Sequence, residues 1–162
     1  MSSRVLQTWD VERFGGQSTR CELLTFTKRR HDVRKDLWHV LIERLGVTEL
    51  PYPAKETFVS CSEEQARAYL HRYTMFNLAF PSDCVKDVGW SDAVWSSIVS
   101  AIGGEVAWFV NNHMHQCASL EAIRNNSRQD YDPTPITTGA SDGVVAGVTN
   151  DRLFLFVVIN DY

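Results

Sequence analysis

The chain has 162 residues, of which 44% are hydrophobic, 22% charged and 11% aromatic, a balance typical of one globular domain spanning 1–162. This composition excludes a largely disordered chain, and no apolar run approaches the ~20 residues of a membrane-spanning helix. The formal net charge of −4 is uneven, because residues 1–48 hold nine bases and six acids whereas residues 49–162 hold seven bases and fourteen acids. An acidic bulk of this kind disfavours nucleic acid and favours a basic partner.

The first third of the chain predicts two strands and a helix. Residues 4–9 and 20–27 are extended in character and flank Gly15-Gly16, which favours an N-terminal hairpin with a long loop. Residues 32–45 predict a helix that ends at Gly46, where a left-handed residue is expected. Its apolar positions recur at three- and four-residue steps: Val33, Leu37, Val40, Leu41 and Leu45.

A short strand and a second helix are predicted next. Residues 57–61 read as a strand, and Ser62 with Gln65 matches a capping box, so a helix should run from there to about Tyr73. The apolar residues 75–80 fit either a strand or the tail of this helix.

The middle of the chain predicts a third helix, which opens at Ser91 and ends at Gly103-Gly104. Residues 105–111 then read as a strand and 119–126 as a short helix. Residues 127–142 contain few core formers and predict a surface loop. The apolar stripe of the third helix should pack on a sheet and consists of Val94, Trp95, Ile98, Val99 and Ile102.

The C-terminal end predicts a β-hairpin of residues 143–148 and 153–159, joined through Asn150-Asp151. The second of these strands is continuously apolar, which indicates a central strand covered on both faces. The order of elements predicts an α+β domain, with a mixed and mostly antiparallel sheet packed against three to four helices.

Three potential metal ligands alternate along one segment. His113, His115 and Cys117 would point to one face if the strand through Val110 continued. Imidazole and thiolate bind zinc or copper, but a closed zinc site needs a fourth ligand, for which no residue is singled out. The alternative is a polar strand end with solvated histidines, and we expect no cofactor.

A basic cluster occupies residues 28–35, at a strand end and the first turn of a helix. It could contact phosphates, as in a nucleic acid, or an acidic patch on a partner. The simpler alternative is a solvated face that pairs with Asp32, Asp36 and other acids.

No nucleophile elbow, Walker loop, dinucleotide fingerprint or zinc-protease motif is present in the sequence. A Cys-His nucleophile has no local signature either, so we expect no catalytic activity. Trp95 and Trp108 lie in periodic apolar segments and are predicted to be core residues. Buried thiols are predicted for the four cysteines, whose spacings match no disulfide framework: Cys21, Cys61, Cys84 and Cys117.

Aromatic residues lie beside acids in two segments that we interpret as partner-binding. Trp90 precedes Asp92, and Tyr131 lies between Asp130 and Asp132. A large ring supplies buried area at an interface, and a neighbouring carboxylate steers and pairs with Arg or Lys. These residues predict a face that captures a basic protein surface.

In size, acidity, lack of catalytic motifs and terminal hairpin, the chain resembles the small cytosolic α+β immunity proteins that bacteria pair with toxins. The resemblance implies a non-enzymatic inhibitor that binds a toxin or effector one-to-one, or a phage-encoded inhibitor of a host defence enzyme. The start, Met-Ser-Ser-Arg-Val-Leu, lacks the apolar stretch of a signal peptide, so we expect a cytoplasmic location. The alternative function is a small metal-binding protein or metal-dependent enzyme that uses His113, His115 and Cys117.

Overall fold

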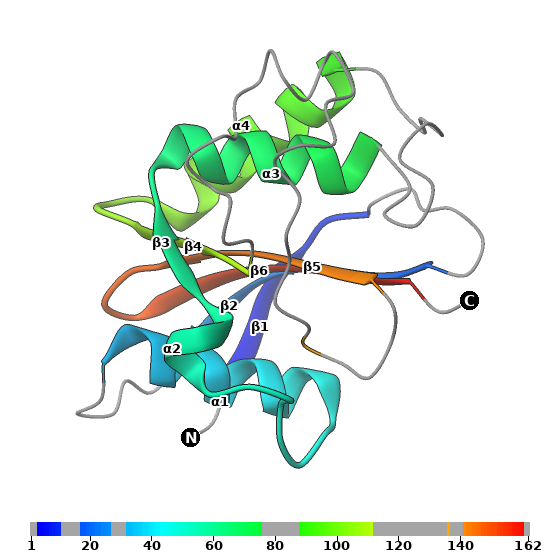
Figure 1. Cartoon of the computed structure of the whole chain (residues 1–162). Helices are drawn as coiled ribbons and strands as arrows, with labels where there is room; N and C mark the ends of the chain where they lie inside the picture. Colours follow the sequence, from blue (N-terminus) through cyan, green and yellow to red (C-terminus); the bar gives the residue numbers. More distant parts are fainter. Residues whose placement is uncertain are drawn as a thin grey trace.

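A six-stranded sheet lies between two layers of helices in the computed structural model of the chain (Figure 1). The structure describes residues 3–10, 17–26, 32–75, 88–111, 136 and 141–160. The strands are β1 Ser3–Thr8, β2 Gln17–Phe26, β3 Val59–Cys61, β4 Ala107–Val110, β5 Ser141–Val148 and β6 Arg152–Asn160. The helices are α1 Val33–Leu45, α2 Ala54–Thr57, α3 Glu63–Met75 and α4 Val88–Ile102.

The strand order is β1-β2-β6-β5-β4-β3, and every pairing among these strands is antiparallel. The predicted α+β class is therefore confirmed, with an antiparallel sheet in the described part rather than a mixed one. Both predicted hairpins are present, as β1-β2 and β5-β6. They join through β2 and β6, so strands from opposite ends of the sequence are neighbours inside the sheet.

Strand β6 is buried on both faces, as its continuous apolar sequence predicted. Phe154, Phe156 and Val158 belong to the core under α3 and α4. The alternate residues Leu153, Leu155 and Val157 belong to the core over α1. All six side chains are at most 2% exposed. The period-two alternation of a strand thus divides one apolar run between two cores.

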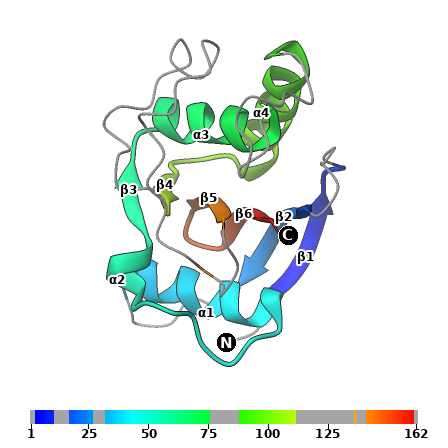
Figure 2. The ribbon, with the colours of Figure 1, turned by 45° about the vertical axis from the view of Figure 1, so that its right-hand side comes forward.

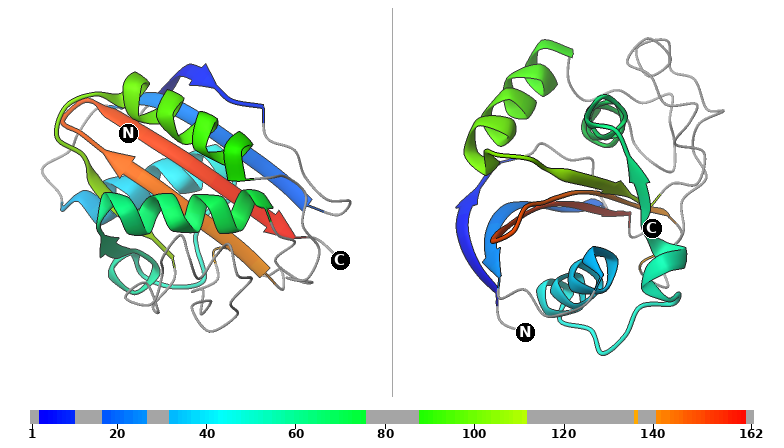
Figure 3. Two further views of the ribbon diagram at one scale, coloured as in Figure 1. Left: turned by 90° about the horizontal axis from the view of Figure 1, so that it is seen from above. Right: turned by 90° about the vertical axis from the view of Figure 1, so that its left-hand side faces the viewer.

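The helices cover opposite faces of the sheet. Helices α3 and α4 lie on one face, and α1 with the short α2 lies on the other (Figures 2 and 3). Trp95 of α4 packs on Trp108 of β4 with ring centroids 4.9 Å apart, and both are buried. The prediction that these two tryptophans are core residues is confirmed, and so is the packing of the α4 stripe on the sheet.

Local sequence signals fix several helix ends. A carboxylate oxygen of Asp32 accepts the amide of Lys35 at 3.0 Å, and Gly46 adopts φ 68° to end α1. The predicted capping box is formed in full: Ser62 Oγ accepts the Gln65 amide, and Gln65 Oε1 accepts the Ser62 amide.

Three boundaries differ from the prediction. Thr57 lies in α2 rather than in a strand, because the Pro53 carbonyl accepts its amide and hydroxyl and closes a helical turn. Helix α4 begins at Val88, so Ser91 is an interior residue, and serine is tolerated there as well as at a cap. Strand β4 starts at Ala107, because Gly103 and Gly104 form a left-handed turn before it.

Several predicted segments lie outside the described residues. These are 76–80, the helix at 119–126, and the loop at 127–142 except for Ile136, Ser141 and Asp142. Met75 is the last residue of α3, and Ser141 and Asp142 open β5 rather than closing a loop.

Candidate functional site: an acidic groove between sheet and helices

Asp92 is the one predicted partner-binding residue whose side chain the structure describes. Its Oδ1 pairs with Arg67 and lies 3.0 Å from Nε2 of the buried His71. Arg67 and His71 belong to α3, whereas Asp92 belongs to α4. The carboxylate therefore holds two helices together, and its charge is already matched inside the molecule.

The other predicted site residues are not placed by the structure. Trp90 lies in α4, and only its backbone is described. Asp130, Tyr131, Asp132 and the potential metal ligands lie outside the described residues, so their roles stay predictions. Within the described ranges, no group of three or more His, Cys, Asp or Glu side chains could hold a metal ion.

The structure describes only residues 32–35 of the basic cluster, because residues 28–31 lie outside the described ranges. The Arg34 guanidinium lies over the Phe109 ring, 5.9 Å from its centroid. Asp32 caps the helix, and Asp36 is fully buried. Asp36 therefore does not lie on a solvated surface, whereas its pairing with residues 28–31 stays a prediction because they lie outside the described residues.

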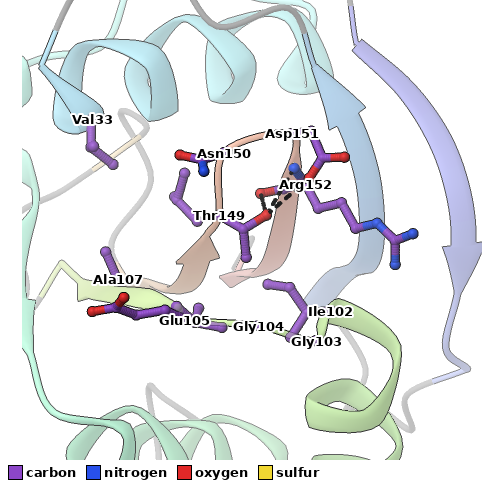
Figure 4. A pocket seen from close by; sticks show the side chains of 12 residues that line it. Val33, Ile102, Gly103, Gly104, Glu105, Ala107, Thr149, Asn150, Asp151 and Arg152 are labelled. Carbon is purple, nitrogen blue, oxygen red and sulfur yellow. Dashed lines mark hydrogen bonds between the residues drawn. The ribbon is translucent and has the colours of Figure 1, made fainter.

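A wide pocket lies where the sheet ends beside α1 and α4. It holds about 740 Å³, within the range of roughly 300–1,000 Å³ for ligand sites. The β5-β6 turn forms one wall, and the turn from α4 to β4 forms the opposite wall (Figure 4). Asp151 stands on the first wall and Glu105 on the second.

Two further pockets of about 390 Å³ extend this space between β3, α3 and α4. The first of them, the middle pocket, shares the lining residues Gly103, Gly104 and Val106 with the wide pocket. The middle pocket also shares Glu63 and Val99 with the second, the far pocket, whose lining includes Trp95 and Glu64. The three pockets are therefore neighbours along shared lining residues, and together we call them the acidic groove.

Carboxylates dominate this groove. Glu63, Glu64, Glu105 and Asp151 are all exposed, and none of the ion pairs within the described residues uses them. Both arginines that line it are already engaged. Arg67 pairs with Asp92, and Arg152 donates to the Ala101 carbonyl at 2.9 Å. Donation to a neutral carbonyl leaves the Arg152 charge in place, but the four carboxylates outnumber it, so the groove presents net negative charge to an incoming group.

Cys61, the thiol in the groove, has a raised pKa. Burial raises the pKa of Cys61 from 9.0 to about 12, and burial followed by the charge of Glu22 raises the pKa of Cys21 still further. A thiolate is the reactive form of cysteine, so neither residue is a nucleophile near neutral pH. The prediction of buried thiols is confirmed for Cys21, whereas Cys61 is only partly buried.

A second polar cluster is structural and lies where α3, β4 and β5 meet. The Asp142 carboxylate accepts the Ile136 amide at 3.1 and 3.2 Å, and Asn111 Oδ1 accepts the Val144 amide at 2.9 Å. Asn111 and Asp142 are at most 1% exposed. Their hydrogen bonds satisfy backbone amides, so this cluster fixes the fold.

Sequence reasoning missed the four acids of the groove. Glu105 follows a Gly-Gly turn and Asp151 sits in a hairpin turn, whereas Glu63 and Glu64 open a helix. Each acid has a local explanation in its own turn, and only the tertiary structure brings them along one groove. The sequence held one signal for these acids, because each of them lies beside a predicted chain reversal or helix start.

No protein-family model, curated protein or solved structure matches this chain. Among the described helices, none is long and apolar enough to cross a membrane.

Proposed function

We propose that this protein is a non-enzymatic binding protein whose acidic groove captures a basic segment of a protein partner. The observation that carries the proposal is the groove itself, in which four exposed carboxylates face solvent while both lining arginines are engaged elsewhere. Carboxylates in a concave surface focus the electrostatic field and accelerate association with a cationic partner.

The chemistry of the groove supports binding rather than turnover. Its cysteine has a raised pKa, and its four carboxylates are exposed to solvent. The same charge repels phosphate backbones, which argues against nucleic acid as the ligand of this surface.

The more specific proposal is neutralisation of a toxin or effector, as the resemblance to immunity proteins implies. In that case the groove residues act together with the predicted aromatic and acidic residues Asp130, Tyr131 and Asp132. An inhibitor of this kind should abolish the partner's activity at a one-to-one ratio.

The test is affinity capture from a lysate of the source organism, with three versions of the protein as bait. Glu105→Gln/Asp151→Asn removes two charges from the groove. Glu49→Lys changes the net charge by the same amount at an exposed position outside it. We expect the wild type and Glu49→Lys to retain a common basic protein, and the groove variant to associate with it about tenfold more slowly at low salt.

Equal association rates for the groove variant and the wild type would remove the groove from the interface. A partner that binds all three versions without losing any activity would rule out neutralisation.

A further inference from the structure

Where the wide and middle pockets meet, the α4-β4 turn presents backbone without side chains. Gly103 and Gly104 line both the wide and the middle pocket. A Cβ built at either glycine meets no atom within 4 Å, so a side chain there would stand in open space. The two glycines thus form a low saddle between the wide and narrow parts of the groove, which lets another main chain approach closely.

The saddle also offers hydrogen-bond donors. Gly103 donates its amide to the Val99 carbonyl as the helix ends. Among the hydrogen bonds of the described residues, none uses the backbone amide of Gly104 or Glu105, and both residues are exposed. An incoming backbone carbonyl could accept from these amides without displacing a partner within the described structure.

Charge and apolar surface alternate along the groove. Glu105 and Asp151 flank the wide end, and Glu63 and Glu64 flank the narrow end. Between them the lining includes four apolar side chains, which are Val99, Val106, Trp108 and Cys61. A ligand that matches this pattern carries cations at both ends and an apolar residue between them.

We infer that the groove binds an extended basic peptide segment of the partner rather than a folded surface, with its main chain over the Gly103-Gly104 saddle. A Lys or Arg side chain lies between Glu105 and Asp151, an apolar side chain lies near Val106, and a second cation lies near Glu63 and Glu64. The inference rests on the proposed function and deepens it by naming the segment that is bound.

A matched pair of glycine variants tests the saddle. Gly103→Asn adds a side chain at a residue that lines the groove, and asparagine tolerates the left-handed backbone that Gly103 adopts at φ 62°. Gly46→Asn is the control, because Gly46 has φ 68°, also ends a helix and lies outside the groove.

The probe is a fluorescein-labelled peptide, Lys-Gly-Leu-Gly-Lys, compared with Glu-Gly-Leu-Gly-Glu by fluorescence anisotropy at low and physiological salt. We expect the lysine peptide to bind the wild type, Gly46→Asn and Glu49→Lys with dissociation constants within threefold of each other. Gly103→Asn and Glu105→Gln/Asp151→Asn should each weaken binding at least tenfold, and the glutamate peptide should not bind.

The outcomes separate the inference from the proposed function. If the charge variant weakens binding but Gly103→Asn does not, the groove attracts cations but no main chain crosses the saddle, and the inference fails alone. If neither variant changes binding, or Glu49→Lys weakens it as much, the groove is not the site and the proposed function fails as well.

Discussion

The ring of Tyr73 lies directly against Gly143 of β5. A Cβ built at Gly143 would lie 2.9 Å from three ring carbons of Tyr73. The ring has little room to move, because it stacks on Phe156 at an interplanar angle of 6°. Its hydroxyl also lies 3.5 Å from Asn111 Oδ1. Helix α3 packs this closely on the sheet because β5 has no side chain at that position.

This contact predicts that Gly143→Ala destabilises the protein by about 1–3 kcal/mol, the usual range for overpacking a core. The sign of the change in the free energy of unfolding is informative. Without a clash, alanine in place of glycine in a strand would stabilise the protein by roughly 0.5–1 kcal/mol. Urea unfolding measures the difference. In a Tyr73→Leu background the loss should shrink, and an unchanged loss would assign the cost to something other than this ring.

Substitutions at Asp92 and Asp151 should have opposite effects on stability and on binding. Asp92→Asn removes a charge that pairs with Arg67 and the buried His71, and we expect a loss of about 1–2 kcal/mol in the free energy of unfolding. Asp151→Asn removes an exposed charge whose one side-chain contact among the described residues is 3.5 Å to the Thr149 hydroxyl, and stability should change by no more than about 0.5 kcal/mol.

For binding of the basic peptide, the two substitutions should rank in the opposite order. Asp151→Asn should weaken binding while Asp92→Asn leaves it unchanged. A large binding defect in a folded Asp92→Asn protein would restore Asp92 as a partner-binding residue.

The capping box of α3 predicts that Ser62→Ala destabilises the protein by about 1 kcal/mol. The mutation leaves the Gln65 amide without its acceptor at the start of the helix. Ser60→Ala is the control, since Ser60 is an exposed serine in β3, two residues earlier. Thermal unfolding of both variants measures the contrast, and equal melting temperatures would show that the cap contributes nothing.

The thiols of Cys21 and Cys61 predict a loss of stability at alkaline pH. Burial raises the pKa of Cys61 from 9.0 to about 12, and the pKa of Cys21 is raised as well. Above pH 9 the unfolded chain releases thiol protons that the folded protein keeps, so stability falls as pH rises towards 12. The slope for each buried thiol approaches about 1.4 kcal/mol per pH unit.

Urea unfolding between pH 8 and 10.5 checks this slope. Cys61→Ala should lower the slope relative to the wild type, because the variant lacks one of the two thiols, while other titrating groups contribute equally to both proteins. Identical slopes would mean that Cys61 ionises equally in the folded and unfolded chains.

The sequence determined those features that depend on neighbours in the chain. The repeat of apolar residues identified α1 and the packed face of α4, and the serine and glutamine at positions 62 and 65 fixed the start of α3. The apolar run at 153–159 indicated a strand buried on both faces, because alternate side chains of a strand must find apolar surroundings on opposite sides.

Only the tertiary structure decided how distant segments meet. The pairing of β2 with β6 joins residues more than a hundred positions apart, and no local pattern specifies that register. The pairing of Asp92 with Arg67 and His71 likewise depends on the docking of α4 against α3. The acidic groove arises where two turns and a helix start converge, each of which is explained locally by its own turn or cap residues. Charge in the sequence therefore predicted a basic partner, whereas the place where that charge gathers depends on contacts between residues far apart in the chain.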